Sequence, residues 1–235
     1  MIRVLAFISL FVFVEKLDSQ NPVLYLFPGQ GSDERIFSEI RFDSTYKIVN
    51  ISYPIPEKGI SMKDYALILK KQIDTASNYS FIGVSIGGML CSELADVLHP
   101  KKTIIISSAK CRKELPFRYR FQKNIPIYKL FPKGAIKFGA RMLQPIVEPD
   151  RNKNKATFKS MLKNKNSKFL KRTVNMIIRW DKKTYNKNII HIHGTKDHTL
   201  PIRKTKPTIT IKKGSHMMTL TRGKEIEKIL NSLLK

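Results

Sequence analysis

The stretch that decides the fold is FIGVSIGGML, residues 81–90, in which a short apolar run passes directly into Gly-x-Ser-x-Gly at Gly83, Ser85 and Gly87. This five-residue pattern alone is weak, because glycine and serine are common in ordinary turns. Its surroundings are more informative. An apolar run before Ser85 predicts a buried strand, and apolar residues at helical spacing after it predict a helix. The combination is typical of a serine nucleophile held on a sharp strand-to-helix turn.

Strands and helices alternate on both sides of this turn. Apolar runs predict strands at 23–27, 46–52, 80–84, 102–108, 188–194 and 208–211. Helices are predicted at 61–74, after Ser85, at 167–180 and at 224–234. The first of them starts with a capping box, Ser61 to Asp64. Such alternation predicts an α/β fold, with a mainly parallel sheet of about six strands flanked by helices. The helix after Ser85 is expected to place four apolar residues on one face: Leu90, Leu94, Val97 and Leu98.

Residues 112–167 break the alternation. They contain apolar patches, several prolines and many lysines, but no convincing strand. A segment of this length is too long for one loop of a compact domain, so we predict an insertion of short helices that covers something. The rest of the domain then comprises residues 21–111 and 168–235.

Two further reactive residues follow predicted strands. Asp197 lies just after the strand that ends at Gly194, and His216 lies between the last strand and the last helix. Parallel sheets place their chemistry at the carboxyl ends of the strands. We therefore predict a triad in which His216 is the general base for Ser85 and Asp197 orients and stabilises the imidazole. The chain order Ser, Asp, His is that of α/β-hydrolases.

An acyl-transfer site also needs two N–H groups for the developing oxyanion. The residue after the nucleophile, Ile86, offers one. The glycine-rich loop after the first strand offers the other, and Gln30 between Gly29 and Gly31 is the expected donor. Gly83 and Gly87 are expected beside Ser85 because a side chain there would collide with the neighbouring strand or helix.

Other candidate residues have weaker support. His191 and His193 share a strand face and suggest metal ligands, but no third ligand is evident, so no metal site is predicted. Asp150 and Asp181 lie away from strand ends and are poorer candidates for the acid. His198 either lines the site or lies exposed in its loop, and His99 is expected at a helix C-terminus.

The trio Asp33, Glu34 and Arg35 either caps a short helix, with Asp33 as N-cap, or supplies Arg35 to bind an anion.

Charge is the outlier of the composition. The chain has 44 Lys and Arg against 18 Asp and Glu, a formal charge of +26. Residues 112–188 hold much of this excess. Such a positive charge attracts anionic substrates, acidic lipid headgroups or nucleic acid. The excess of lysine also has a second explanation, because the chain is rich in Lys, Asn and Ile together, as A/T-biased codons would produce. No nucleic-acid-binding motif is present, so a nucleic-acid partner is not predicted. An anionic membrane or envelope surface is a possible partner of the basic segment.

The N-terminal residues bear on where in the cell the protein is located. Arg3 followed by the apolar run 4–14 predicts a signal peptide over residues 1–20, and hence a periplasmic or secreted protein. The alternatives are a strand of the domain, which leaves the protein cytoplasmic, or an uncleaved membrane anchor.

Cys91 and Cys111 are too few for a disulfide framework and are expected to be buried thiols.

Four segments carry a family resemblance: FPGQGSDERIF (27–37), GVSIGGML (83–90), ISSAKCRKELPFRYR (106–120) and HIHGTKDHTLPI (191–202). They resemble a small bacterial group of α/β-hydrolases of unassigned substrate, with a Pro/Ser-Gly-x-Gly-x-Asp-Glu-Arg-x-Phe oxyanion loop. The resemblance runs from about Val23 to the C-terminus. Pro28 stands where many relatives have His, and Ser215 where Gly often precedes the catalytic His.

The resemblance implies the α/β-hydrolase fold, with residues 112–167 as a helical cap. It also implies Ser85, Asp197 and His216 as the catalytic residues, with Gln30 and Ile86 as oxyanion donors. The expected activity is hydrolysis of a carboxylic ester or thioester of a small molecule through an acyl-serine intermediate, without cofactor or metal. An acyltransferase using the same triad and a non-catalytic ligand-binding member of the fold are the alternatives.

Overall fold

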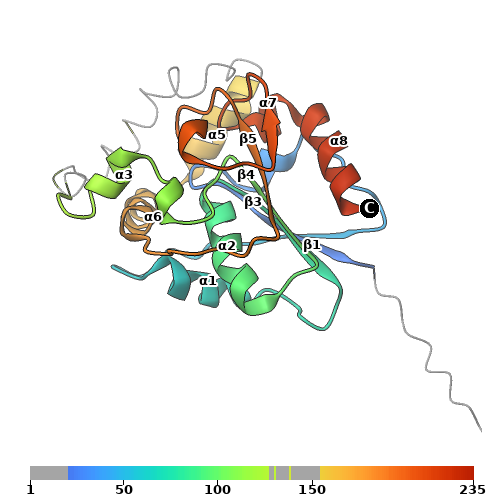
Figure 1. Cartoon of the computed structure of the whole chain (residues 1–235), viewed down its shortest axis with the longest axis horizontal. Helices are drawn as coiled ribbons and strands as arrows, with labels where there is room; N and C mark the ends of the chain where they lie inside the picture. The colour runs from blue at the N-terminus through green and yellow to red at the C-terminus, as the bar shows by residue number, and fades with distance from the viewer. Residues whose placement is uncertain (1–20, 127–129, 131–137, 139–153) are drawn as a thin grey trace, which may run out of the picture.

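A computed structural model of the chain describes residues 21–126, 130, 138 and 154–235. The described residues form one sheet in the order β2-β1-β3-β4-β5-β6, and each neighbouring pair of strands is parallel. The strands are β1 (Val23–Phe27), β2 (Lys47–Asn50), β3 (Tyr79–Val84), β4 (Lys102–Ile106), β5 (Ile189–Gly194) and β6 (Ile209–Ile211). The prediction of a mainly parallel sheet of about six strands flanked by helices is confirmed (Figure 1).

Helices cover both faces of this sheet. They are α1 (Met62–Lys70), α2 (Ile86–Leu98), α3 (Phe117–Phe121), α5 (Lys155–Asn164), α6 (Ser167–Arg179), α7 (Met218–Thr221) and α8 (Gly223–Leu234), with short 3₁₀ turns η1 (Glu34–Phe37), η2 (Arg112–Glu114) and η5 (Ile202–Lys204). Figure 1 shows α1 and α2 on one side of the sheet and α8 on the other. One core cluster joins α1, α2 and α6 to the sheet, and a second joins η1, α5, α7 and α8 to its opposite face.

The central strands are apolar because they are buried on both faces. All six residues of β3 are buried, and Ile104, Ile105 and Ile106 of β4 are fully inaccessible to solvent. A sheet covered by helices on both faces requires continuous apolar runs rather than alternation. At the edge of the sheet, β2 is mostly exposed and has a more polar sequence.

The parallel arrangement determines where a site can form. All strands end at the same edge, so the loops after β1, β3, β5 and β6 meet there. These loops carry Gln30, Ser85, Asp197 and His216.

The structure tests the predicted cap of α1 and the predicted apolar face of α2. Ser61 caps α1, and its Oγ accepts a hydrogen bond from the Asp64 N–H at 3.0 Å. On α2, Leu90 and Leu94 are buried, but Val97 is 41% exposed. Leu98, in the same last turn, is partly buried and packs against the core, so the prediction is wrong for Val97 alone, which lies on the solvent side of this turn.

In the described part of the 112–167 segment the structure has the short elements η2, α3 and α5, and the insertion with its bounds stays a prediction. Its remainder, like Asp150 and the proposed signal peptide, lies outside the described residues. Among the residues that are described, no helix is both long enough and apolar enough to cross a bilayer.

Candidate active site

Ser85 occupies a strained turn between β3 and α2. Its backbone has φ 56° and ψ −121°, a left-handed conformation that is unfavourable for a residue with a side chain. The turn is held by the Ser85 N–H, which donates to the Ile106 carbonyl at 3.0 Å, and by Ser108 Oγ, which donates to the Ser85 carbonyl at 2.6 Å. Bonds from both sides thus keep the serine in a conformation that it does not favour by itself.

Glycine is required on both sides of this turn. A Cβ atom at Gly83 would lie 2.6 Å from backbone atoms of Gly87 and Gly88. A Cβ atom at Gly87 would lie 2.1 Å from the Phe27 carbonyl oxygen on β1. The predicted reason for these glycines, close approach of strand and helix, agrees with this geometry.

His216 and Asp197 lie beside Ser85 and form a continuous chain of contacts with it. His216 Nε2 is 2.9 Å from Ser85 Oγ, and His216 Nδ1 is 2.8 Å from Asp197 Oδ2. A carboxylate only accepts, so Nδ1 carries the proton and Nε2 presents its lone pair to the serine hydroxyl. The structure thus brings together the three residues that the sequence nominated, in the arrangement that a serine nucleophile and its base require.

The two loops that carry His216 and Asp197 are joined to each other. The Lys196 N–H donates to the Gly214 carbonyl at 2.9 Å, and the Thr195 N–H donates to the Ile211 carbonyl at 3.0 Å. Gly194 permits this contact, since a Cβ atom there would lie 2.2 Å from the Gly214 oxygen. The relative position of acid and base is therefore set by backbone bonds rather than by side chains alone.

Asp197 is a buried, charged acid. Its side chain is inaccessible to solvent, and its second oxygen, Oδ1, accepts from the Leu200 N–H at 2.7 Å. Burial acts to raise the pKa of Asp197. The charge and hydrogen bond of His216, together with His193 and the Leu200 N–H, outweigh this effect and lower the pKa below its ordinary value. Asp197 is therefore ionised at neutral pH.

The expected oxyanion donors lie next to Ser85. Gly29 packs against the serine, and a Cβ atom there would lie 3.5 Å from Ser85 Cβ. Neither the Gln30 N–H nor the Ile86 N–H makes a hydrogen bond to any other residue that the structure describes. Gly31 has more space, since a Cβ atom there would only touch Leu162 at 3.8 Å. At Gly29 the nearest atom to such a Cβ is Ser32 Oγ at 3.1 Å, so position 29 is tighter than position 31, but neither shows the close backbone approach found at Gly83 and Gly87.

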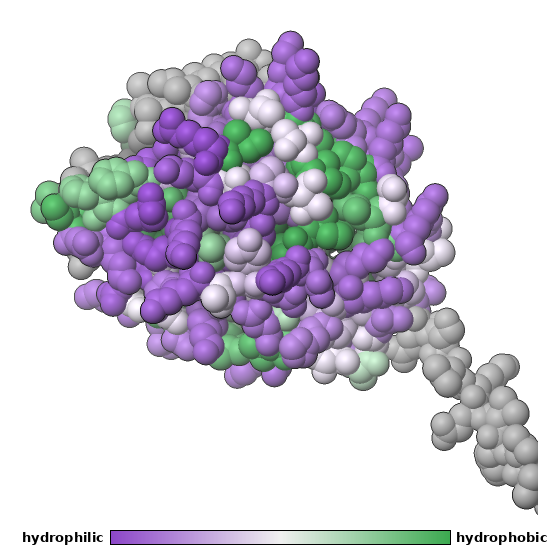
Figure 2. Space-filling model, in the orientation of Figure 1, coloured by the Kyte–Doolittle hydropathy of each residue, from purple (hydrophilic) through white to green (hydrophobic). Residues whose placement is uncertain are grey.

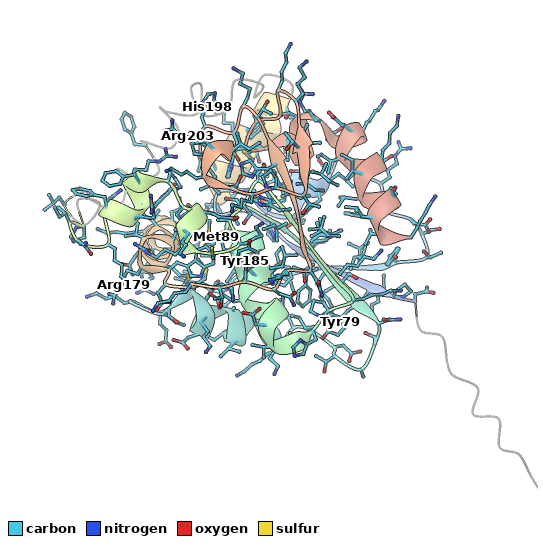
Figure 3. All side chains as sticks on the ribbon, viewed as in Figure 1. Tyr79, Met89, Arg179, Tyr185, His198 and Arg203 are labelled. Atoms are coloured by element: carbon cyan, nitrogen blue, oxygen red, sulfur yellow. The ribbon has the colours of Figure 1, made fainter. Side chains whose placement is uncertain are left out.

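A cavity of about 210 Å³ opens above Ser85. Gln30, Ser85 and His216 form part of its polar side. Its apolar wall comes from the sheet, from α2, α5 and α6, and from the loops after β5 and β6: Ile36, Val84, Met89, Phe158, Leu162, Leu170, Ile177, Leu200 and Met217. Figure 3 labels Met89, which lies in the interior on α2. Helices α5 and α6 thus wall a cavity whose floor carries the serine.

The remaining histidines lie outside the triad. His191 and His193 are both fully buried, with His191 Nε2 3.0 Å from His193 Nδ1. The described residues contain no cluster of three groups that could hold a metal. His198 is exposed and, with Arg203, lines a second hollow that also borders Asp197. Figure 3 labels both residues. His99 ends α2 in a left-handed conformation, as expected for a helix C-terminus.

The other candidates are structural or distant from the site. Asp33 caps η1 and binds Arg35 through two oxygens at 2.8 and 2.7 Å, while Arg35 also donates to Ser160 of α5. This favours the capping interpretation over an anion site. Asp181 is exposed at the surface. Cys91 and Cys111 are buried free thiols, as predicted.

Sequence reasoning missed contacts made by side chains that are far apart in the chain. The Gln30 amide donates to the Leu170 carbonyl at 3.0 Å and to Thr173 Oγ1 at 2.7 Å, which ties the oxyanion loop to α6. His193 Nε2 lies 3.4 Å from Asp197 Oδ2. The only sequence signal for the second contact is the position of His193 directly before Gly194 at the end of β5.

The sequence matches no protein-family model and no curated protein. Solved structures share its fold. A thermophilic esterase from Thermogutta terrifontis superposes with a TM-score of 0.69 at 12% identity, covering 91% of this chain and 89% of the esterase. A lipase-esterase related protein from Clostridium acetobutylicum gives 0.61 at 14% identity, with coverages of 91% and 94%. The enol-lactonase from Burkholderia xenovorans gives 0.64 at 12% identity, with 91% of each chain covered.

These similarities establish the α/β-hydrolase fold, which confirms the fold prediction. Identities of this size show the fold and not the activity, because one fold supports many functions. The narrower resemblance to a group with the Pro28–Phe37 loop motif stays a prediction.

Proposed function

We propose that this protein is a serine hydrolase that cleaves a carboxylic ester of a small molecule through an acyl-Ser85 intermediate. The observation that carries the proposal is the unbroken chain from Asp197 through His216 to Ser85, which ends on a strained turn at the floor of an apolar cavity. Each member lies within hydrogen-bond distance of the partner that its proposed role requires.

The proposed reaction proceeds in two steps. His216 Nε2 takes the proton of Ser85 as Oγ bonds to the ester carbonyl carbon, and the resulting oxyanion is bound by the N–H groups of Gln30 and Ile86. His216 then gives this proton to the alkoxide as the ester C–O bond breaks, leaving the acyl-serine. Water adds to the acyl-serine in the same way, with His216 again as base, and releases the acid and the free serine.

Asp197 stabilises the imidazolium that forms in each step. Its buried charge is bound by the Leu200 N–H, so it holds the Nδ1–H tautomer of His216 without becoming protonated itself. The lowered pKa of Asp197 supports this role at neutral pH.

The cavity suggests the chemistry of the substrate. Among the described residues that line it, none is a Lys, Arg, Asp or Glu, although the chain carries a charge of +26. An ionic group in this cavity would lose hydration without gaining a partner. The group that binds there is therefore proposed to be uncharged and mainly apolar, such as a short or medium acyl chain. A thioester with such an acyl group fits the same chemistry.

Ser85 labelling tests the proposal most directly. The full chain, a Ser85→Ala variant and a control Ser44→Ala variant at an exposed position are treated with a fluorophosphonate, and their turnover of p-nitrophenyl esters from acetate to palmitate is measured. We expect labelling and turnover in the wild type and the control, and a loss of at least about a thousandfold in Ser85→Ala. A folded wild-type protein that takes no label at Ser85 contradicts the proposal and favours a ligand-binding role.

We also propose that the protein acts at an anionic membrane or envelope surface. Support comes from α3, where Phe117 is 66% exposed and Phe121 is 38% exposed beside Arg118 and Arg120. Figure 2 shows apolar surface at the position of α3, next to strongly hydrophilic surface. Exposed aromatic rings with basic neighbours suit the headgroup region of anionic lipids.

Export remains part of this proposal. The apolar run 4–14 behind Arg3 supports a signal peptide over residues 1–20. N-terminal sequencing of the protein from a bacterial periplasmic fraction tests it. A cytoplasmic protein that still begins at Met1 contradicts it.

A further inference from the structure

Strand β5, which lies between β4 and the edge strand β6, carries two buried imidazoles. His191 and His193 are both inaccessible to solvent, and their rings are perpendicular with centroids 4.9 Å apart. Burying a polar ring is unfavourable unless its nitrogens are hydrogen-bonded. Here His191 Nε2 is 3.0 Å from His193 Nδ1, and His193 Nε2 is 2.7 Å from the Leu200 carbonyl oxygen. The fourth nitrogen, His191 Nδ1, is buried without a hydrogen-bond partner among the described residues.

These contacts fix the tautomers of both rings. The Leu200 carbonyl only accepts, so His193 carries its proton on Nε2. Burial lowers the pKa of His193 and lowers that of His191 further, so both rings are neutral. His193 Nδ1 is then an acceptor, and His191 Nε2 donates to it. The charged and titratable neighbours are Lys110 for His191, and Asp197 and His216 for His193.

The donor of His193 faces the acid of the site. Its Nε2 lies 3.4 Å from Asp197 Oδ2, the same oxygen that binds His216 Nδ1. The peptide group that His193 binds belongs to Leu200, whose own N–H donates to Asp197 Oδ1. The single Nε2 proton of His193 goes to the Leu200 carbonyl, so the ring packs against Asp197 Oδ2 without a hydrogen bond to it. His193 also holds Leu200, the residue whose N–H binds the other oxygen of the carboxylate.

We propose that His193 is a positioning residue of the triad, which holds the Asp197 carboxylate in the orientation that binds His216, and that His191 fixes the His193 tautomer for this purpose. The inference rests on the proposed hydrolase function. Asp197 needs such a partner because it lies in a loop rather than in β5, so its side chain is not oriented by the strand itself.

The effect is expected in the rate of reaction at Ser85 rather than in substrate binding. His193 is not among the residues that line the cavity. Loss of a partner behind a reacting group commonly reduces activity about 10- to 100-fold. A His193→Leu variant should therefore lower kcat by about this factor with little change in KM. In His193→Gln the side-chain amide can place an N–H donor near the position of Nε2, and this variant should retain most of the rate.

The test compares the rate of fluorophosphonate labelling of Ser85 in full-length wild type, His193→Leu and His193→Gln. His198→Leu is the matched control, because His198 lies next to Asp197 but is exposed. Thermal melts monitored by circular dichroism identify variants that are unfolded. We expect labelling about 10- to 100-fold slower in His193→Leu, near wild-type labelling in His193→Gln, and no change in His198→Leu.

The outcomes separate the two proposals. An unlabelled wild type contradicts the hydrolase function itself. A labelled wild type with equally fast His193→Leu overturns only the role of His193, as does a folded His193→Gln that is as slow as His193→Leu. If the variants do not fold, nitrogen NMR of the wild type decides: both rings should carry the proton on Nε2, and an Nδ1–H tautomer of His193 overturns the proposal.

Discussion

At the scale of single residues, the glycines around Ser85 differ in what they do. Gly83 and Gly87 allow two pieces of backbone to lie closer than a Cβ atom permits, whereas Gly31 faces open space toward Leu162. Glycine is thus required at positions 83 and 87 but replaceable at position 31. The distinction depends on neighbours from other elements, so the local sequence does not reveal it.

A pair of alanine substitutions tests this distinction. Gly83→Ala should destabilise the protein by about 3 kcal/mol or more, because backbone atoms of Gly87 and Gly88 must move. Gly31→Ala should change stability by no more than about 0.5 kcal/mol. Urea unfolding monitored by fluorescence measures both values. Equal stability of the two variants would contradict the close approach at Gly83.

At the scale of elements, α5 and α6 connect substrate recognition to the catalytic loop. They wall the cavity through Leu162 and Leu170, and α6 also accepts hydrogen bonds from the Gln30 amide. The loop that carries the proposed oxyanion donor is therefore tied to a helix that lines the cavity. Under the proposed function, this one helix would influence both the size of the acyl group and the geometry of the reaction.

Changes at Leu162 should move the preferred chain length. Leu162→Ala enlarges the cavity by about three carbon atoms, so the optimum should shift toward longer acyl chains. Leu162→Trp should shift it toward acetate. Turnover across the p-nitrophenyl ester series measures the optimum, with Leu67→Ala on the outer face of α1 as control. An optimum that ignores both substitutions at Leu162 means that the acyl chain lies elsewhere.

Much of the fold was predictable because burial leaves a clear pattern. The apolar runs of β3 and β4 predicted strands, and the strand ends placed Ser85, Asp197 and His216 near one another. The exposure of Val97 was not predictable, because helical spacing places it near the apolar face but does not show how far the core reaches around the helix, and only the neighbouring Leu98 is covered. Contacts such as Gln30 with Thr173 join residues from distant parts of the chain, and spacing in one sequence carries no information about them.

At the scale of the whole molecule, the buried histidines make stability depend on pH. Their folded pKa values are lowered, so the unfolded chain binds protons at these sites that the folded protein excludes. Stability is therefore lost as pH falls through the ordinary histidine pKa of 6.5. Asp197 acts in a lower range: its lowered pKa adds stability above its ordinary value of 3.8, which is lost as pH falls further.

A His191→Leu variant tests the histidine contribution. Between about pH 7.5 and about pH 5.5, one fully excluded proton costs at most about 1.4 kcal/mol of unfolding free energy. The variant should lose less stability than the wild type over this interval, by up to that amount. His198→Leu serves as the exposed control. Urea unfolding at both pH values gives the differences, and parallel losses in wild type and His191→Leu would argue against a neutral His191.

The charge of the whole molecule predicts its behaviour at lipid surfaces. The protein should sediment with anionic vesicles at low salt, be released at high salt, and ignore neutral vesicles. Phe117→Ser should weaken vesicle binding roughly tenfold, because the exposed phenyl ring would no longer be buried among the lipids. Ile48→Ser on the edge strand β2 should not weaken it. Binding that is insensitive to salt and lipid charge would count against a surface role.

The left-handed backbone of Ser85 has a consequence for how this position can change in evolution. Glycine adopts such a conformation freely, so Ser85→Gly relieves about 1–3 kcal/mol of strain in the turn. Ser85→Gly would therefore stabilise the turn and remove the hydroxyl in the same step. A lineage that keeps serine here retains a less stable turn in every generation, which is expected only where the chemistry of that hydroxyl is selected.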